Sequence, residues 1–166
     1  MGDSLVGSAS IRVLVVDDYE PWHGFVANIL RQQSELEIVG CVCDGLVAVE
    51  QAEQLQPDLI LLDIGLPTLN GIEAATRIRQ LSPSSKILFV SENHSVDIAE
   101  KALSTGAGGY VVKSDGVSEL LAGVQAVLEG KRFVSARMAA RFLATATLRA
   151  AQMSLSWLVM LISGIR

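Results

Sequence analysis

The sequence predicts an α/β protein in which a parallel sheet is covered by helices on both faces. Short apolar runs rich in Val, Ile and Leu alternate with longer stretches in which apolar residues recur at helical spacing. The short runs do not alternate with polar residues, as expected for strands that are buried on both faces. Half of the 166 residues are hydrophobic and 19% are charged, a composition that favours a packed core over disorder.

Five apolar runs are interpreted as strands, and helical patterns fill the gaps between them. Right-handed crossovers leave few topologies for such a chain, and we expect the strand order 2-1-3-4-5. The predicted strands are residues 11–16, 38–43, 58–62, 86–90 and 109–112. The predicted helices are residues 21–33, 46–55, 71–81, 95–105 and 116–128. Asn70 and Ser95 are typical N-caps, and Gly106 is typical of a helix C-terminus.

Charge is unevenly distributed along the chain. All 18 acidic residues lie at or before Glu129, so residues 1–130 carry a net charge of −11 and residues 131–166 one of +6. This asymmetry indicates a boundary near Gly130. We therefore expect a flexible N-terminus at residues 1–10, a domain at residues 11–130 and a C-terminal helical extension at residues 131–166. The overall charge of −5 does not favour a nucleic-acid partner.

The cysteines and the N-terminus indicate a cytoplasmic protein. Cys41 and Cys43 are one residue apart, a poor spacing for a disulfide, and no further ligand completes a metal site. We interpret them as small buried hydrophobic residues in a reducing compartment. The N-terminus has neither the basic nor the apolar region of a signal peptide.

Polar residues follow four of the predicted strands and carry the chemistry. Asp17 and Asp18 follow the first strand, Asp63 the third, Ser91 the fourth and Lys113 the fifth. The carboxyl ends of parallel strands share one edge, and ligands bind there where the strand order reverses. With the expected order, the three carboxylates converge and the other two residues flank them. Each residue alone is also an ordinary turn former, so the prediction depends on their joint placement.

Three carboxylates at one edge repel each other, and a hard divalent cation removes that conflict. Mg²⁺ prefers oxygen ligands, keeps some waters and usually works together with a phosphate. A carboxylate such as Asp63 can accept a phosphoryl group as an acyl phosphate, a reaction that needs alignment and charge neutralisation. The pattern therefore predicts a Mg²⁺-dependent phosphoryl acceptor.

Five segments resemble the receiver domains of bacterial response regulators, in particular those that precede a helix-turn-helix output domain. They are VLVVDDYEP, PDLILLDIGLP, NGIEAATRIR, ILFVSEN and GAGGYVVKSD, and the resemblance covers roughly residues 10–130. It implies a flavodoxin-like, doubly wound, five-stranded sheet. It also implies that Asp63 is the phosphoacceptor, and that Asp18, Asp63 and the Gly65 carbonyl bind Mg²⁺ directly. Asp17 would act through a metal-bound water.

The resemblance further implies a switch. Lys113 would pair with the phosphoryl group, while Ser91 and Tyr110 would form the switch pair. Their movement would repack the face made by the fourth helix, the fifth strand and the fifth helix. Two departures stand out. Ser114 replaces a common Pro, which favours a trans peptide there, and Glu92 replaces a small residue and could hinder phosphodonors.

The expected function is therefore that of a response regulator in a two-component phosphorelay. The partner would be a sensor histidine kinase or a phosphotransfer protein, and the chain would be no enzyme beyond self-catalysed phosphoryl transfer and slow autodephosphorylation. Two alternatives stay open. A phosphohydrolase with an Asp nucleophile would need an Asp-x-Asp-x-Thr motif, which the Asp63 segment lacks. A degenerate receiver that acts only as a protein-interaction module would not need the retained acids.

The tail after Gly130 reads as a helix from about Ala136, without helix-turn-helix patterning, so no direct DNA binding is expected. One stripe is polar and the opposite side is apolar, ending in the run WLVMLI. That run is too short to span a bilayer. Three interpretations stay open: pairing with a second copy or docking on the acidic body; contact with an anionic membrane surface; and the remnant of a truncated regulator. A homodimer could also form through the fourth helix, fifth strand and fifth helix.

Overall fold

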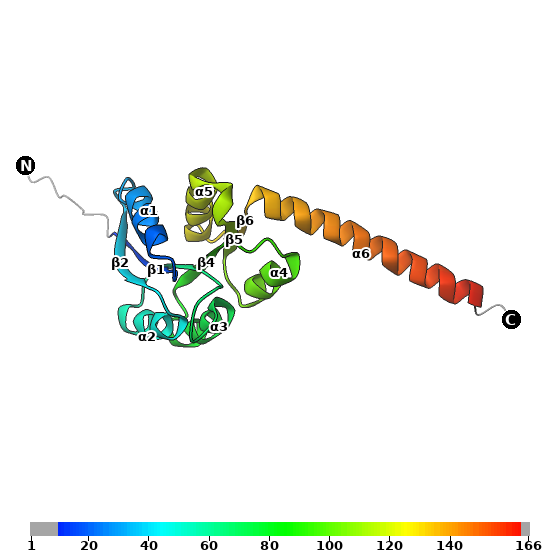
Figure 1. Cartoon of the computed structure of the whole chain (residues 1–166), viewed down its shortest axis with the longest axis horizontal. Coiled ribbons are helices and arrows are strands. Elements are labelled where there is room, and N and C mark those ends of the chain that lie inside the picture. The colour runs from blue at the N-terminus through cyan, green and yellow to red at the C-terminus, as the bar shows by residue number, and fades with distance from the viewer. Residues whose placement is uncertain (1–9, 164–166) are drawn as a thin grey trace, which may run out of the picture.

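The structure is a computed structural model that describes residues 10–163. A parallel sheet lies at its centre, with strand order β2-β1-β3-β4-β5-β6 (Figure 1). The strands are β1 (Ile11–Val16), β2 (Leu36–Val42), β3 (Leu59–Leu62), β4 (Lys86–Ser91), β5 (Gly109–Val112) and β6 (Phe133–Val134). The helices are α1 (Glu20–Leu30), α2 (Gly45–Leu55), α3 (Gly71–Leu81), α4 (Val96–Ser104), α5 (Val117–Leu128) and α6 (Ala136–Ser163), with a 3₁₀ turn η1 at Lys113–Asp115. The flavodoxin-like α/β class is confirmed.

The prediction of five strands was wrong, because β6 adds a sixth at the edge of the sheet. Phe133 and Val134 pair in parallel with Gly109 and Tyr110 of β5. A side chain at Gly109 would lie 2.6 Å from the Phe133 carbonyl oxygen, so the absence of a Cβ allows the two strands to approach. A two-residue strand has no periodicity to detect in a sequence. The sheet therefore extends past the boundary that was expected near Gly130.

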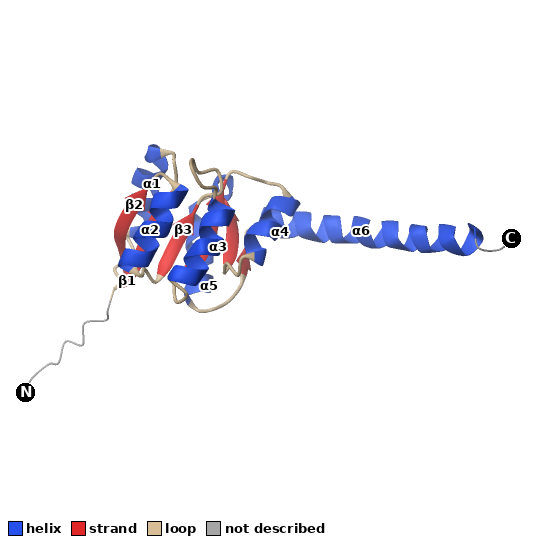
Figure 2. Ribbon diagram, turned by 90° about the horizontal axis from the view of Figure 1, so that it is seen from below, coloured by secondary structure: helices blue, strands red, loops and turns tan. Residues whose placement is uncertain are grey.

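Helices cover both faces of the sheet (Figure 1 and Figure 2). Two apolar layers fill the space between the sheet and these helices. Alternate strand residues point to opposite faces, since side chains in a strand have a period of two. Val13 and Val15 of β1 belong to the layer that includes residues of α1 and α5, whereas Leu14 and Val16 belong to the layer that includes residues of α2, α3 and α4. The central strands are buried on both faces, which explains their continuous apolar sequence.

The three residues predicted to cap helices are confirmed in that role. The Asn70 side chain accepts hydrogen bonds from the backbone N–H groups of Ile72 and Glu73, and the Ser95 hydroxyl accepts one from Ile98. Gly106 has a φ of 89°, a left-handed conformation that favours glycine.

Two other predictions concern the cysteines and the N-terminus. The prediction that Cys41 and Cys43 are buried was wrong, because both are exposed on the edge strand β2 or directly after it. The expected flexible N-terminus at residues 1–10 lies outside the described residues except for Ser10, whose hydroxyl donates to the Glu37 carboxylate.

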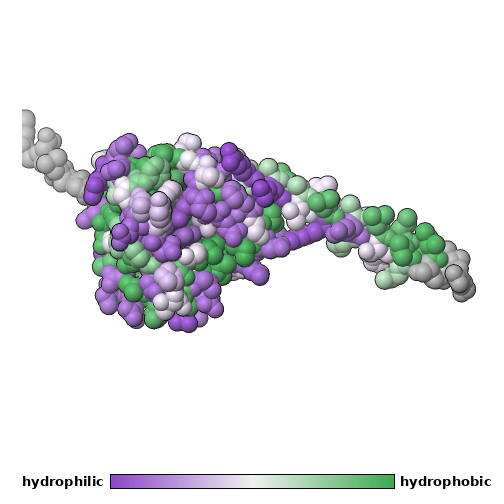
Figure 3. All heavy atoms as spheres, in the orientation of Figure 1, coloured by the Kyte–Doolittle hydropathy of each residue, from purple (hydrophilic) through white to green (hydrophobic). Residues whose placement is uncertain are grey.

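Helix α6 begins on the domain and then projects away from it (Figure 1). Near its start, Met138 is fully buried in the layer that includes α4, and Phe142 is partly buried beside it. Two arginines continue the contact with α4: Arg141 donates to the His94 carbonyl oxygen, and Arg149 pairs with acids of α4. Beyond this region the helix is exposed and strongly apolar (Figure 3). Within residues 10–163, no helix is long and apolar enough to cross a membrane.

Candidate functional site

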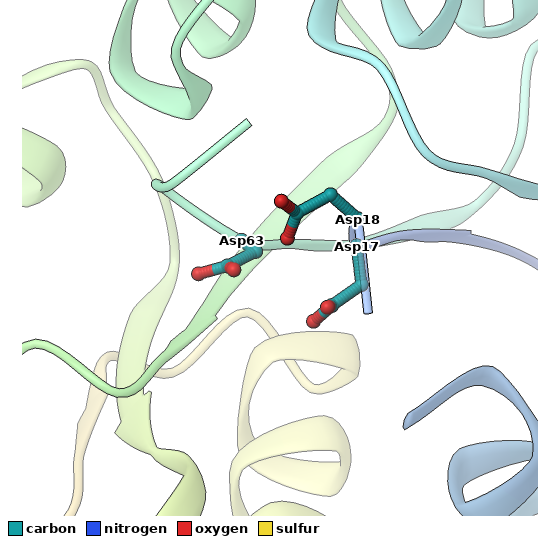
Figure 4. Close-up of side chains that lie close together, drawn as sticks. All are labelled: Asp17, Asp18 and Asp63. Atoms are coloured by element: carbon teal, nitrogen blue, oxygen red, sulfur yellow. The ribbon is translucent and has the colours of Figure 1, made fainter. Parts of the chain in front are cut away.

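Three carboxylates converge at the carboxyl edge of the sheet, as the sequence predicts. Asp17 and Asp18 follow β1 and Asp63 follows β3, its neighbour in the sheet. One carboxylate oxygen from each lies within 4.8 Å of the other two, and the side chains face a common space (Figure 4). The parallel register accounts for this meeting, because Val16 pairs with Leu62 and both strands end at the same level.

Asp17 is the most buried of the three acids, with 1% of its surface exposed. Its Oδ1 accepts a hydrogen bond from the Tyr19 backbone N–H at 3.0 Å, and its Oδ2 lies 2.5 Å from the Lys113 Nζ. Burial raises the pKa of Asp17, and the lysine and the backbone hydrogen bond only partly oppose this effect. A further positive charge at this position would therefore stabilise the ionised form.

Asp63 is held at the start of a tightly built loop. It is buried, its Oδ1 accepts a hydrogen bond from the Ile64 N–H at 2.7 Å, and its Oδ2 lies 3.3 Å from the Lys113 Nζ. Gly71, the first residue of α3, allows the loop to close on itself. A Cβ there would lie 1.9 Å from the Asp63 carbonyl oxygen, so any larger residue would displace the backbone that carries the carboxylate.

Lys113 supplies the positive charge of the site. Its Nζ contacts the carboxylates of both Asp17 and Asp63 and also lies over the Trp22 ring, 5.2 Å from the ring centroid. Burial by itself lowers the pKa of Lys113, but the two facing carboxylates outweigh that effect and the net shift is upward. Lys113 is therefore a permanent cation at neutral pH. The contact of Lys113 with Trp22 was not predicted from the sequence.

The backbone of Asn93 links Ser91 to Tyr110. The Asn93 N–H donates to the Ser91 Oγ at 3.3 Å, and the Tyr110 hydroxyl donates to the Asn93 carbonyl oxygen at 2.8 Å. Tyr110 is fully buried, and desolvation raises its pKa to about 12. Asn93 was missed as part of this connection because its backbone, and not its side chain, makes both bonds.

A shallow hollow opens the site to solvent beside Asp63. Gly65 and Glu92 both line it, together with Asp63, Ile64, Ser91 and Asn93. Gly65 follows Asp63 closely enough that a Cβ on it would lie 3.9 Å from the Asp63 Oδ2. Glu92 is exposed and lines the same opening, so it lies beside the hollow through which Asp63 is reached from solvent. The predicted site residues are therefore all brought together in one region.

A family model described as the response regulator receiver domain matches residues 13–125. The chain belongs to the response regulator receiver family. It is similar to the transcriptional regulatory protein DegU of Brevibacillus brevis, with 33% identity over 129 residues that cover 78% of this chain and 55% of DegU. It is also similar to the response regulator GacA of Pseudomonas viridiflava, with 30% identity over 129 residues that cover 78% of this chain and 60% of GacA.

Among solved structures, the receiver is similar to a LuxR-family two-component response regulator from Aurantimonas sp. SI85-9A1. The TM-score is 0.77 at 28% identity, covering 84% of this chain and 99% of the other. The curated relatives named above are longer, and this chain spans 55% and 60% of their lengths. The comparisons therefore establish a receiver that acts in two-component signal transduction, and they leave the activity of a longer protein to proposal.

Receivers typically bind Mg²⁺, and the residues of this site fit such an ion. The donors are carboxylate oxygens, which suit a hard cation. Lys113 contacts two of the three acids, Asp17 and Asp63, so the cluster carries more negative than positive charge. Burial is the main cause of the raised pKa of Asp17, and the neighbouring Asp63 carboxylate adds to it.

Proposed function

We propose that this receiver accepts a phosphoryl group on Asp63 with the help of Mg²⁺. The observation that supports the proposal is the meeting of Asp17, Asp18 and Asp63 with the Lys113 ammonium at one edge of the sheet. Asp18 and Asp63, with the Gly65 carbonyl oxygen, would hold the ion directly, and Asp17 would act through a bound water. When bound, Mg²⁺ would neutralise charge on the phosphoryl oxygens.

The chemical step needs no reactant beyond a phosphorylated donor. An Asp63 carboxylate oxygen forms a bond to phosphorus, and the bond from phosphorus to the donor breaks. With a histidine kinase or a phosphotransfer protein as donor, the leaving group is a neutral imidazole that keeps the electron pair. The product is an acyl phosphate on Asp63. Lys113 would pair with the added phosphoryl group, because its Nζ already contacts the Asp63 carboxylate.

The Ser91 hydroxyl and Tyr110 would then carry the change outwards. Movement of Ser91 toward the phosphoryl group alters the loop that contains Asn93, whose carbonyl oxygen accepts the Tyr110 hydrogen bond. The neighbouring His94 carbonyl oxygen accepts a hydrogen bond from Arg141 of α6. In this chain the face formed by α4, β5 and α5 therefore includes the start of α6, and the population of its packings would shift with phosphorylation.

The proposal places the chain in the cytoplasm, with a sensor histidine kinase or a phosphotransfer protein as its partner. It would be no enzyme beyond self-catalysed phosphoryl transfer to its own Asp63 and slow autodephosphorylation. A homodimer through α4, β5 and α5 would have to accommodate α6, because Arg149 lies against Asp97 and Glu100 of α4.

Incubation with acetyl phosphate and Mg²⁺, followed by intact-mass measurement, tests the proposal. We expect one added phosphoryl group, absent in Asp63→Asn and retained in the control Glu53→Gln, an exposed acid on α2. Chelation of the metal should abolish the adduct. Steady phosphate release without an adduct would instead indicate a phosphohydrolase. Absence of both reactions in the folded protein would indicate a module that only binds other proteins.

A further inference from the structure

The distal half of α6 presents a regular apolar row to solvent. Leu148, Ala151, Leu155, Leu158 and Ile162 follow one another at alternating spacings of three and four residues. The four large members are exposed to between 56% and 67% of their surface. A monomer rarely leaves a contiguous row of this kind uncovered, since its exposure to water is unfavourable.

The row is not part of the contact between α6 and α4. Helical periodicity places it on a different side of α6 from Met138 and Arg149, the residues that pack in the layer containing α4 and on the α4 acids. These contacts therefore leave the row uncovered, and its large side chains are exposed.

The distribution of charge on α6 indicates which partner could cover the apolar row. A helix that lies on an anionic membrane carries basic residues along its polar side. The arginines of α6 all lie in its first half, where Arg137 pairs with Asp115, Arg141 donates to a backbone carbonyl and Arg149 pairs with two acids. From residue 150 to residue 163 the helix carries no charged side chain. An anionic surface therefore finds nothing to attract it along the apolar row.

We infer that the row pairs with the same row of a second copy of this chain. Alternating spacings of three and four keep an apolar row facing a partner helix, so that side chains of each insert between those of the other. A second copy offers the same uncharged, apolar row, and a two-fold axis makes such a surface complementary to itself. The inference rests on α6 alone and does not depend on phosphorylation.

Light scattering of the full chain over a concentration series tests the pairing. We expect the mass of two chains for the unmodified protein and the mass of one chain for Leu155→Glu, with the dissociation constant raised at least tenfold. The control is Ser156→Glu, which adds the same charge at the adjacent residue but on the side of the helix away from the row. It should remain dimeric. Circular dichroism should show equal helix content in both variants.

Three outcomes would overturn the inference. The first is a monomeric unmodified chain at every concentration. The second is equal dimerisation of Leu155→Glu and the unmodified chain. The third is a chain that is monomeric in buffer but binds vesicles containing phosphatidylglycerol, with loss of that binding in Leu155→Glu. The third result would assign the row to a lipid surface.

Discussion

Binding of Mg²⁺ is expected to change the fluorescence of Trp22. The Trp22 ring lies 5.2 Å from the Lys113 Nζ, which in turn contacts the Asp17 carboxylate at 2.5 Å. A cation bound to the acids weakens the attraction between the Asp17 carboxylate and the Lys113 ammonium. The position of the ammonium charge relative to the indole ring therefore changes. The other tryptophan, Trp157, is exposed on α6 and would add a constant background, so the measurement uses a Trp157→Phe chain.

Removal of one charge from the cluster should weaken this binding measurably. Two unit charges about 4 Å apart interact with about 4 kcal/mol near a protein surface and about 1 kcal/mol in bulk water. The Asp17 charge is already shared with Lys113, so we expect the lower part of this range for Asp17→Asn. A loss of roughly 1.4 to 2.7 kcal/mol corresponds to a roughly 10- to 100-fold weaker Mg²⁺ affinity.

Removal of the lysine is expected to strengthen Mg²⁺ binding. Lys113 competes with a cation for the same carboxylates, so Lys113→Met should bind Mg²⁺ more tightly, by roughly tenfold if one charge contact of about 1.4 kcal/mol is relieved. Because the lysine also sits over Trp22, this variant is measured by calorimetry. Glu53→Gln, a change at an exposed acid of α2 outside the cluster, should leave the affinity unchanged.

The two variants are expected to change the Mg²⁺ affinity in opposite directions. Unchanged affinity in Asp17→Asn would show that the acid does not sense the metal. A weaker affinity in Lys113→Met would show that the lysine helps to hold the ion's environment and does not compete with it. Absence of any Mg²⁺ response in the unmodified chain would refute the cation site itself.

Three further predictions concern the core, the switch and the entrance to the site. Met138→Ala should lower the free energy of unfolding by about 2–5 kcal/mol in a denaturant titration, because the side chain is fully buried; a change below about 0.5 kcal/mol would show that α6 does not belong to the core. The pKa of Tyr110 is raised to about 12, so the folded state holds its proton more tightly than the unfolded state, whose pKa is about 10. The corresponding contribution to the free energy of unfolding, ~3 kcal/mol, is present below pH ~10 and is lost as the pH rises through ~12. The Tyr110→Phe variant should not show this loss, and equal pH dependence of both proteins would contradict the prediction. Glu92→Ala should accelerate phosphorylation by the anionic donor acetyl phosphate by a few-fold, because the carboxylate lines the hollow beside Asp63; an unchanged rate would exclude the hindrance.

The convergence of the three acids could be predicted because it depends only on topology. Once β1 and β3 are neighbours in a parallel sheet, the residues that follow Val16 and Leu62 must lie at the same edge. The position of Lys113 at the same edge follows in the same way from its place directly after β5. None of these placements needs knowledge of a side-chain rotamer.

Other features could not be predicted because they depend on backbone groups or on very short segments. The connection from Tyr110 to the loop after β4 uses the Asn93 carbonyl oxygen, which every residue type carries. The strand β6 has two residues and exists because Gly109 lets it approach β5. The exposure of Cys41 reflects the position of β2 at the edge of the sheet, which leaves one side of that strand uncovered.

Apolar burial, and not the visible ion pairs, holds α6 on the domain. Arg149 and its partners Asp97 and Glu100 are all substantially exposed, and exposed ion pairs contribute little because solvent screens them. Met138 is fully buried among residues of the α4 layer. A shift in the loop after β4 can therefore break the arginine contacts at small cost while Met138 keeps the start of α6 in place. We therefore expect phosphorylation to change the direction of the projecting part of α6 more readily than the packing of its first turns.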